Sequence, residues 1–153
     1  MPIFIIGLLL EAISRLLDIY ITNLGNIFSE MSIWILFGII ISIYSTNKKD
    51  AMVNMLLFCI GMLLTYYFTV YITKGVYSNS YIIGWTIFAL CSPIFAYFTW
   101  MTKEKGIFSK IISIGIILVS VLSSIILFDK LRISDYIIDG LLFYYLFVKK
   151  INR

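Results

Sequence analysis

Long apolar runs separated by short polar segments occupy almost the whole sequence. Mean hydropathy is +1.02, and charged residues make up 13% of the chain, well below the ~25% of soluble domains. A transmembrane helix needs about 20 predominantly apolar residues, so a chain of 153 residues has room for about six. The pattern therefore predicts one integral membrane domain, residues 1–153, built as an all-α bundle of six transmembrane helices.

Clusters of turn-forming or charged residues bound the six predicted spans. The spans cover Pro2–Ile21, Met31–Ser45, Ala51–Thr73, Tyr81–Met101, Ile111–Phe128 and Ile133–Val148. The last run is only ~24 Å long at about 1.5 Å per residue, so the bundle has five spans if this run does not cross. Pro93 lies near the middle of the fourth span, where the missing backbone donor predicts a kink. Turn formers in residues 22–26 and a half-turn over Phe28–Glu30 are expected after the first span.

Basic residues alternate in density from one connection to the next. The connections after the second and fourth spans, together with the tail, carry eight lysines and arginines, and the opposite set carries three. Cytoplasmic loops are enriched in lysine and arginine. The sequence therefore predicts a multi-pass protein of the plasma membrane with both termini cytoplasmic and the lipid bilayer as its surroundings. Isoleucine-rich, alanine-poor usage indicates an AT-rich bacterial genome.

Three charged residues interrupt the first span, namely Glu11, Arg15 and Asp18. Their spacing places them on one helical stripe, where both carboxylates can neutralise Arg15. Counted from the cytoplasmic side, Glu11 and Asp139 lie about 13 Å deep, and Arg15 and Asp135 about 20 Å deep. If the first and last helices are neighbours, one arginine faces four carboxylates in a single cluster within the membrane.

Two interpretations of this predicted cluster remain open. An excess of carboxylates favours binding of a small cation, or protonation of one carboxylate. Alternatively, the charges form a salt-bridge network that fixes the helix register, with Asp18 and Asp135 hydrated at the outer surface.

Aromatic residues gather toward the predicted outer half of the spans. They are Trp34, Tyr66, Tyr67, Tyr71, Tyr77, Tyr81 and Trp85. Tryptophan and tyrosine form belts at the membrane interface, and they also line pockets that stack on flat or cationic molecules. Tyr66, Tyr67 and Trp85 lie deep for a belt. We therefore expect these three, with Trp34 and the five charged residues, to bind a small cationic or aromatic ligand.

The sequence lacks most of the groups that catalysis and metal binding require. It contains no histidine, and its two cysteines, Cys59 and Cys91, lie in apolar runs without a CxxC motif. Asp135 and Asp139 form a DxxxD, but the neighbouring elements of lipoprotein signal peptidases and CDP-alcohol transferases are missing. We predict no catalytic residue, metal site or cofactor. Cytoplasmic loops account for the net charge of +4, so we expect no nucleic-acid partner.

Four glycines fall one in each of the second to fifth spans, at Gly38, Gly61, Gly84 and Gly115. Glycine permits close approach of neighbouring transmembrane helices. We expect these residues to serve helix packing.

Scattered glycine and aromatic positions carry a resemblance to a known family. Leu24-Gly25-Asn26, Trp34, Gly38, Gly61, Tyr66-Tyr67 and Trp85 resemble the pattern of small bacterial multi-helix membrane proteins classed only as a domain of unknown function. In size, number of spans and cytoplasmic termini the chain is also similar to the substrate-binding membrane components of energy-coupling-factor transporters. Those components dock their partner through AxxxA spacing on the first helix, where this chain offers only Ala12.

Three functions follow from these patterns. Our main interpretation is a transporter or ligand-binding membrane subunit, which is not an enzyme and which uses the charged cluster and the outer aromatics. The first alternative is an accessory, assembly or immunity protein whose charged stripe binds a helix of another membrane subunit. The second alternative is an intramembrane carboxylate enzyme that acts on lipid.

Overall fold

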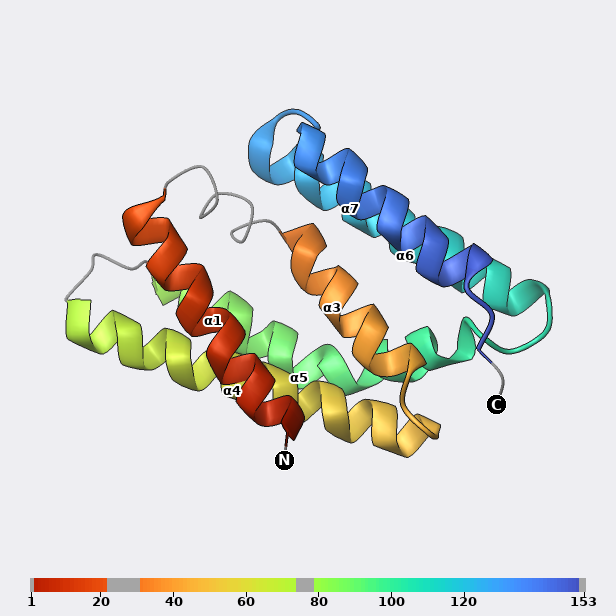
Figure 1. The fold of residues 1–153 in the computed structure, drawn as a ribbon, viewed down its shortest axis with the longest axis horizontal. Helices are drawn as coiled ribbons and strands as arrows, with labels where there is room; N and C mark the ends of the chain where they lie inside the picture. Colours follow the sequence, from red (N-terminus) through yellow and green to blue (C-terminus); the bar gives the residue numbers. More distant parts are fainter. Residues whose placement is uncertain (1, 22–30, 74–78, 152–153) are drawn as a thin grey trace.

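The computed structural model describes residues 2–21, 31–73 and 79–151. Within these residues the chain forms six α-helices and one π-helical turn and no strand (Figure 1). They are α1 (Pro2–Tyr20), α3 (Met31–Ile43), α4 (Lys48–Thr73), α5 (Asn79–Met101), α6 (Ile107–Phe128), α7 (Ile133–Phe143) and the π-helical turn η1 (Tyr144–Val148). The all-α prediction is confirmed. The turn expected over residues 22–26 and the half-turn over Phe28–Glu30 lie outside the described residues.

Three of the described helices are long and apolar enough to cross a membrane. The crossing segments are Lys48–Ile72 of α4, Ile82–Met101 of α5 and Ile107–Ile126 of α6. Helix α3 is apolar but has only 13 residues, and α7 has 11 residues before η1 begins. The structure therefore supports insertion into a membrane, and six crossings remain a prediction.

Consecutive helices run in opposite directions, so the chain passes back and forth along one axis (Figure 1). Helix α1 packs against α4, and α4 packs against α5. Helix α3 lies in the middle, where it contacts α4 and α5 on one side and α6 and α7 on the other. Helix α3 therefore joins two groups of helices. The first group is α1, α4 and α5, and the second is α6 and α7.

Each side of α3 contributes to a separate apolar core. Trp34 packs with Phe58 of α4 and Ala96 of α5 in the first core. Ile39 packs with Leu142 of α7 in the second. A helix that is buried on all sides is apolar around its whole circumference. This burial explains why the short α3 carries no charged residue.

Two glycines allow α1 and α4 to cross at backbone distance. A Cβ atom added at Gly61 would lie 2.5 Å from the carbonyl oxygen of Phe4, and one at Gly7 would collide with the carbonyl of Phe58. The hydroxyl of Thr65 donates a hydrogen bond to the carbonyl of Leu8 at 3.2 Å. The packing role expected of Gly61 is confirmed, and its counterpart Gly7 was not anticipated.

The other three glycines behave differently from one another. A Cβ atom at Gly38 would meet the side chain of Met55 at 2.8 Å, so this glycine also permits close packing. At Gly84 and Gly115 no atom lies within 4 Å of an added Cβ. The expectation of helix packing is therefore wrong for these two glycines.

Three helices begin earlier than the sequence predicted, and α5 does so by two residues, at Asn79 rather than Tyr81. Helix α4 begins at Lys48 rather than Ala51, because the side chain of Asn47 accepts a hydrogen bond from the backbone N–H of Asp50 at 2.9 Å. Helix α6 begins at Ile107 rather than Ile111. Gly106, with φ of +138°, turns the chain immediately before it. Local capping chemistry therefore converts parts of two predicted loops into helix.

Pro93 lies inside α5, as the sequence indicated. Proline has no N–H to donate to the carbonyl four residues earlier, which is that of Ala89. The hydroxyl of Ser92 donates to this carbonyl at 2.7 Å instead. The helix therefore passes through the proline without leaving a buried acceptor unsatisfied.

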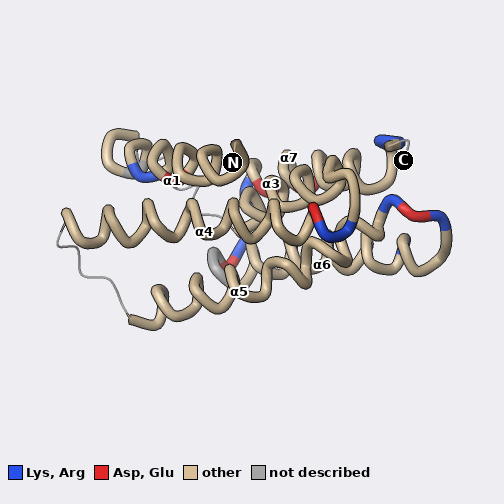
Figure 2. Tube along the Cα trace, turned by 90° about the horizontal axis from the view of Figure 1, so that it is seen from below, with Lys and Arg blue, Asp and Glu red and all other residues tan. Residues whose placement is uncertain are grey.

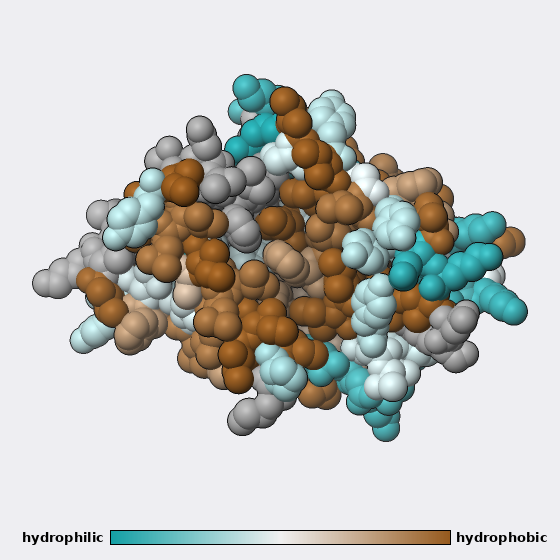
Figure 3. All heavy atoms as spheres, in the orientation of Figure 1, coloured by the Kyte–Doolittle hydropathy of each residue, from teal (hydrophilic) through white to brown (hydrophobic). Residues whose placement is uncertain are grey.

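Charged and apolar residues occupy different parts of the surface. The charged residues of the first turn of α4, the α5–α6 connection and the C-terminal tail lie toward the same end of the molecule (Figure 2). Apolar side chains cover much of the middle of the face seen in Figure 3. Large exposed apolar residues occur on α1, α4, α5, α6 and α7, far more than an aqueous surface tolerates.

Candidate functional site

The charged residues of the first and last helices form two separate groups. Helix α1 packs against α4, whereas α7 packs against α3 and α6, and α3 lies between them (Figure 1). The condition for a single cluster, contact between the first and last helices, is not met. Glu11 and Arg15 are consequently not joined to Asp135 and Asp139. The charged residues of the first and last helices were predicted at equal depth in the membrane, but equal depth does not bring two helices together. The close crossing at the glycines packs α1 against α4 instead.

The first group joins α1 to α4. Arg15 Nε lies 3.2 Å from Glu11 Oε1, and the guanidinium of Arg15 lies 4.8 Å from the ring centroid of Tyr66 on α4. Glu11 is only 6% exposed, while the side chain of Arg15 is 25% exposed. The ion pair predicted within the first helix is confirmed for Glu11. The side chain of Asp18 lies outside the described residues.

Aromatic contacts extend this first group toward α5. Tyr66 packs edge-on against Tyr67, with ring centroids 6.0 Å apart. The Tyr67 hydroxyl hydrogen-bonds to the hydroxyl of Thr86 on α5. An ion pair, two tyrosines and a threonine thus link three helices, and these contacts stabilise the packing of one helix on the next.

The second group joins α7 to α3 and α6. Asp135 is completely buried. Its Oδ1 accepts hydrogen bonds from Ser124 at 2.9 Å and from Ser32 at 3.5 Å, and its Oδ2 accepts one from the backbone N–H of Arg132 at 2.7 Å. A carboxylate in the first turn of a helix is also favoured by the helix dipole. Asp135 is therefore a buried anchor, and the alternative in which water hydrates it at the outer surface is wrong.

Asp139 lies one helical turn further along α7. Its Oδ1 accepts a hydrogen bond from Ser120 at 2.7 Å, and its side chain is only partly buried. Ser120 and Ser124 are four residues apart on α6, as Asp135 and Asp139 are on α7. The two helices therefore meet through two matched serine–aspartate pairs.

Sequence reasoning missed these serines. Buried serines occur on α6 at Ser109, Ser113, Ser120 and Ser124, and their spacing places them on one face of the helix. Averaged hydropathy hides such a stripe because the surrounding isoleucines and leucines dominate the mean. The positions of the serines themselves were the signal that could have identified the α7 partner face.

Neither group has the composition of a metal site. Within the described residues, no three histidine, cysteine or acidic side chains lie close enough together to hold a metal ion. Cys59 on α4 is buried and Cys91 on α5 is partly buried, and both are free thiols.

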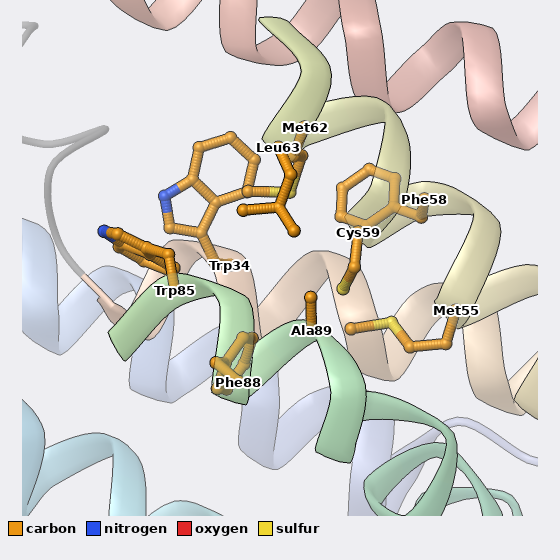
Figure 4. A pocket seen from close by; sticks show the side chains of 9 residues that line it. All are labelled: Trp34, Met55, Phe58, Cys59, Met62, Leu63, Trp85, Phe88 and Ala89. Carbon is orange, nitrogen blue, oxygen red and sulfur yellow. The ribbon is translucent and has the colours of Figure 1, made fainter. Parts of the chain in front are cut away.

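The two tryptophans predicted to bind a ligand line a very small cavity. Trp34 is 4% exposed, and its ring centroid lies 6.3 Å from that of Phe58. Trp34 and Trp85 lie on one side of a cavity of about 20 Å³, with Met55 and Phe58 on the other (Figure 4). This space is the size of a single water molecule and has apolar walls. Tyr66 and Tyr67 do not line this cavity. Tyr66 lies against Arg15 of α1, and Tyr67 bonds to Thr86 of α5.

A much larger cavity lies between α3, α5 and α6, and of the residues predicted to bind a ligand only Trp34 lines it. Its volume is about 420 Å³. Its lining consists of Met31, Trp34, Ile35, Gly38, Ile39, Ser42, Met55, Phe88, Phe95, Ala96, Phe98, Thr99, Ile112, Gly115, Ile116 and Val119. This volume is within the range of small-molecule sites.

The two hydroxyl side chains in this lining are already satisfied by their own helices. Ser42 donates to the carbonyl of Gly38 at 2.7 Å, and Thr99 donates to that of Phe95 at 2.8 Å. The remaining lining is almost entirely apolar. The cavity therefore suits an apolar occupant, and it offers little to the cationic ligand that the sequence suggested.

Comparison with known proteins gives no assignment. No protein family, curated protein or solved structure matches this chain. The resemblances stated above remain predictions, and the geometry of the cavity and of the two charged groups is the basis for a functional assignment.

Proposed function

We propose that this chain is a multi-pass membrane protein that binds an apolar molecule from the bilayer in the cavity between α3, α5 and α6. The cavity itself is the observation that carries the proposal, because its volume of about 420 Å³ lies between three helices, is open at one side and is lined by apolar side chains. Two of these helices, α5 and α6, are long and apolar enough to cross a membrane. Binding by exchange with lipid then requires no aqueous entry path.

The proposed orientation places both termini on the cytoplasmic side. The alternating helix directions (Figure 1) agree with six crossings. The lysines of the first turn of α4 and of the α5–α6 connection lie toward the same end as the basic tail (Figure 2), as the enrichment of cytoplasmic loops in positive charge requires.

The contacts of the charged residues favour ligand binding in the cavity over the other interpretations. Glu11, Asp135 and Asp139 each have a hydrogen-bond donor from a neighbouring turn or helix. A carboxylate enzyme needs a reachable acid or base, and Asp135 has no exposed surface. We assign the carboxylates to helix anchoring.

A brominated alkane provides the test, because bromine quenches tryptophan fluorescence at short range. Trp34 lines the cavity and is 4% exposed, so surrounding lipid has little access to its ring. In a background carrying Trp85→Phe and Trp100→Phe, we expect the alkane to quench Trp34 in a saturable manner.

Two glycine substitutions make a matched pair for this measurement. Neither Gly115 nor Gly84 has an atom within 4 Å of an added Cβ, but only Gly115 lines the cavity. Gly115→Leu should abolish saturable quenching, and Gly84→Leu should leave it intact. Equal quenching in both variants, or no saturable quenching in the parent protein, contradicts the proposal.

A further inference from the structure

We propose, on the basis of the function above, that the natural occupant of the cavity is an acyl chain of an anionic phospholipid whose phosphate lies beside Lys105. The shape of the cavity is the first argument. It extends along α5 from Phe88 to Thr99, about 16 Å at 1.5 Å per residue. An apolar space of this length, open at one side between transmembrane helices, fits a hydrocarbon chain better than a compact molecule.

The position of the cavity relative to the α5–α6 connection is the second argument. Thr99 and Ile112 line the cavity, and the connection that joins their helices comprises residues 102–106. The connection therefore lies within about two helical turns of the cavity on both helices. In the proposed orientation it is at the cytoplasmic interface, where a phospholipid carries its phosphate.

Charge at this connection is the third argument. Lys103 Nζ donates to the carbonyls of Leu146 and Lys149 at 3.1 and 2.7 Å, and Lys48 Nζ lies 3.0 Å from Glu104. Both lysines are therefore engaged within the protein. Lys105 is exposed, and in the described part of the chain it forms no ion pair. It is the cation of this connection that is available to an anionic headgroup.

Lys110 provides a control for Lys105, because it lies near the same connection but its side chain points away from the cavity. It is exposed at the start of α6, two residues before the cavity-lining Ile112. At about 100° per residue it points some 200° away from Ile112 around the helix. A lipid in the cavity should therefore depend on Lys105 and be indifferent to Lys110, although the two substitutions change the net charge equally.

Native mass spectrometry tests the inference with the full-length protein and an equimolar mixture of phosphatidylglycerol and phosphatidylcholine of identical acyl chains. We expect the wild-type protein to retain phosphatidylglycerol about fivefold more than phosphatidylcholine, the effect of one lysine near an anionic headgroup. Lys105→Gln should reduce this preference to near equality, and Lys110→Gln should preserve it. Gly115→Leu should remove retention of both lipids, and Gly84→Leu should not.

Each contrary outcome has a distinct meaning. Equal retention of the two lipids by the wild-type protein overturns the assignment of an anionic lipid, while saturable alkane quenching of Trp34 would still support the proposed function. Equal loss of preference in Lys105→Gln and Lys110→Gln overturns the position of the headgroup. Retention of phosphatidylglycerol by Gly115→Leu shows that the acyl chain lies elsewhere.

Discussion

At the scale of single residues, Asp135 shows how a carboxylate is accommodated inside an apolar bundle. Three donors from three different segments, Ser32, Ser124 and the N–H of Arg132, satisfy its two oxygens. Removing the acceptor would leave these donors buried without a partner, which costs more than the hydrogen bonds contribute. Asp139, with one serine donor and a partly exposed side chain, is under less constraint.

The two aspartates should therefore differ in their effect on stability. We expect Asp135→Ala to lower the free energy of unfolding by about 3 kcal/mol, and Asp139→Ala by about 1 kcal/mol. Thermal unfolding in a mild detergent measures the difference, with Asp135→Asn as an intermediate that keeps one acceptor oxygen. Equal destabilisation by the two alanine variants would show that Asp135 is not the anchor described here.

The ion pair on α1 makes a second prediction at this scale. Glu11 is 6% exposed, so Arg15→Ala leaves a buried carboxylate without its cation. Glu11→Ala leaves an arginine that is 25% exposed and still lies over Tyr66. We expect Arg15→Ala to be the more destabilising by about 1–2 kcal/mol, measured by the same unfolding assay. The reverse order would contradict this assignment of burial and partners.

At the scale of helices, the contact between α1 and α4 depends on the absence of two side chains. The backbones approach so closely at Gly7 and Gly61 that an added Cβ would collide with the opposite helix. Such crossings are a common means of association in membranes, where lipid and leucine are equally apolar and packing must supply the attraction.

Larger residues at this crossing should separate the two helices. We expect Gly61→Val to destabilise the protein by about 2–3 kcal/mol and to expose the Arg15–Tyr66 contact. Gly84→Leu, where no atom lies within 4 Å of an added Cβ, is the matched control and should change stability by less than about 0.5 kcal/mol. Cysteine cross-linking between Leu8 and Thr65, whose side chain bonds to the Leu8 carbonyl, should fall in Gly61→Val alone.

The sequence predicted the helices well and their neighbours poorly. Hydropathy and turn formers located each described helix to within a few residues, including Ile133–Val148, which becomes α7 and η1. They could not show that α1 rests on α4, since adjacency is set by the shapes of residues such as Gly7. The predicted charged cluster failed for this reason, although the Glu11–Arg15 pair, which depends only on helical spacing, was found.

The difference between predicting helices and predicting their neighbours also explains why the sequence did not predict the cavity. The cavity lies between α3, α5 and α6, and small residues such as Gly115 and Ala96 line it. In a sequence these residues indicate close packing as readily as open space. The structure separates the two cases, because an added Cβ has no neighbour at Gly115 but meets Phe4 at Gly61.

At the scale of the whole molecule, an all-helical bundle with three helices able to cross a membrane contains an apolar cavity between α3, α5 and α6. Helix α3 separates the two charged groups and also supplies one wall of the cavity. The charged residues link neighbouring helices, and the cavity is where we propose that a ligand from the bilayer binds.

The proposed orientation can be measured independently of ligand binding. Cysteines introduced at Lys49 and Lys105 should react with a membrane-impermeant thiol reagent only from the cytoplasmic side, and one at Lys130 only from the opposite side. The parent for this experiment carries Cys59→Ser and Cys91→Ser. Labelling of all three positions from one side would exclude an odd number of crossings between residues 105 and 130.

The most direct test of the central claim locates a ligand in the cavity. Crystals grown from a lipidic phase with a brominated alkane should give an anomalous bromine peak between α3, α5 and α6, in van der Waals contact with Gly115 and Ile39. Gly115→Leu should lose this peak. Bromine found only around the outer surface of the helices, with the cavity empty in the wild-type protein, would contradict the proposed binding site.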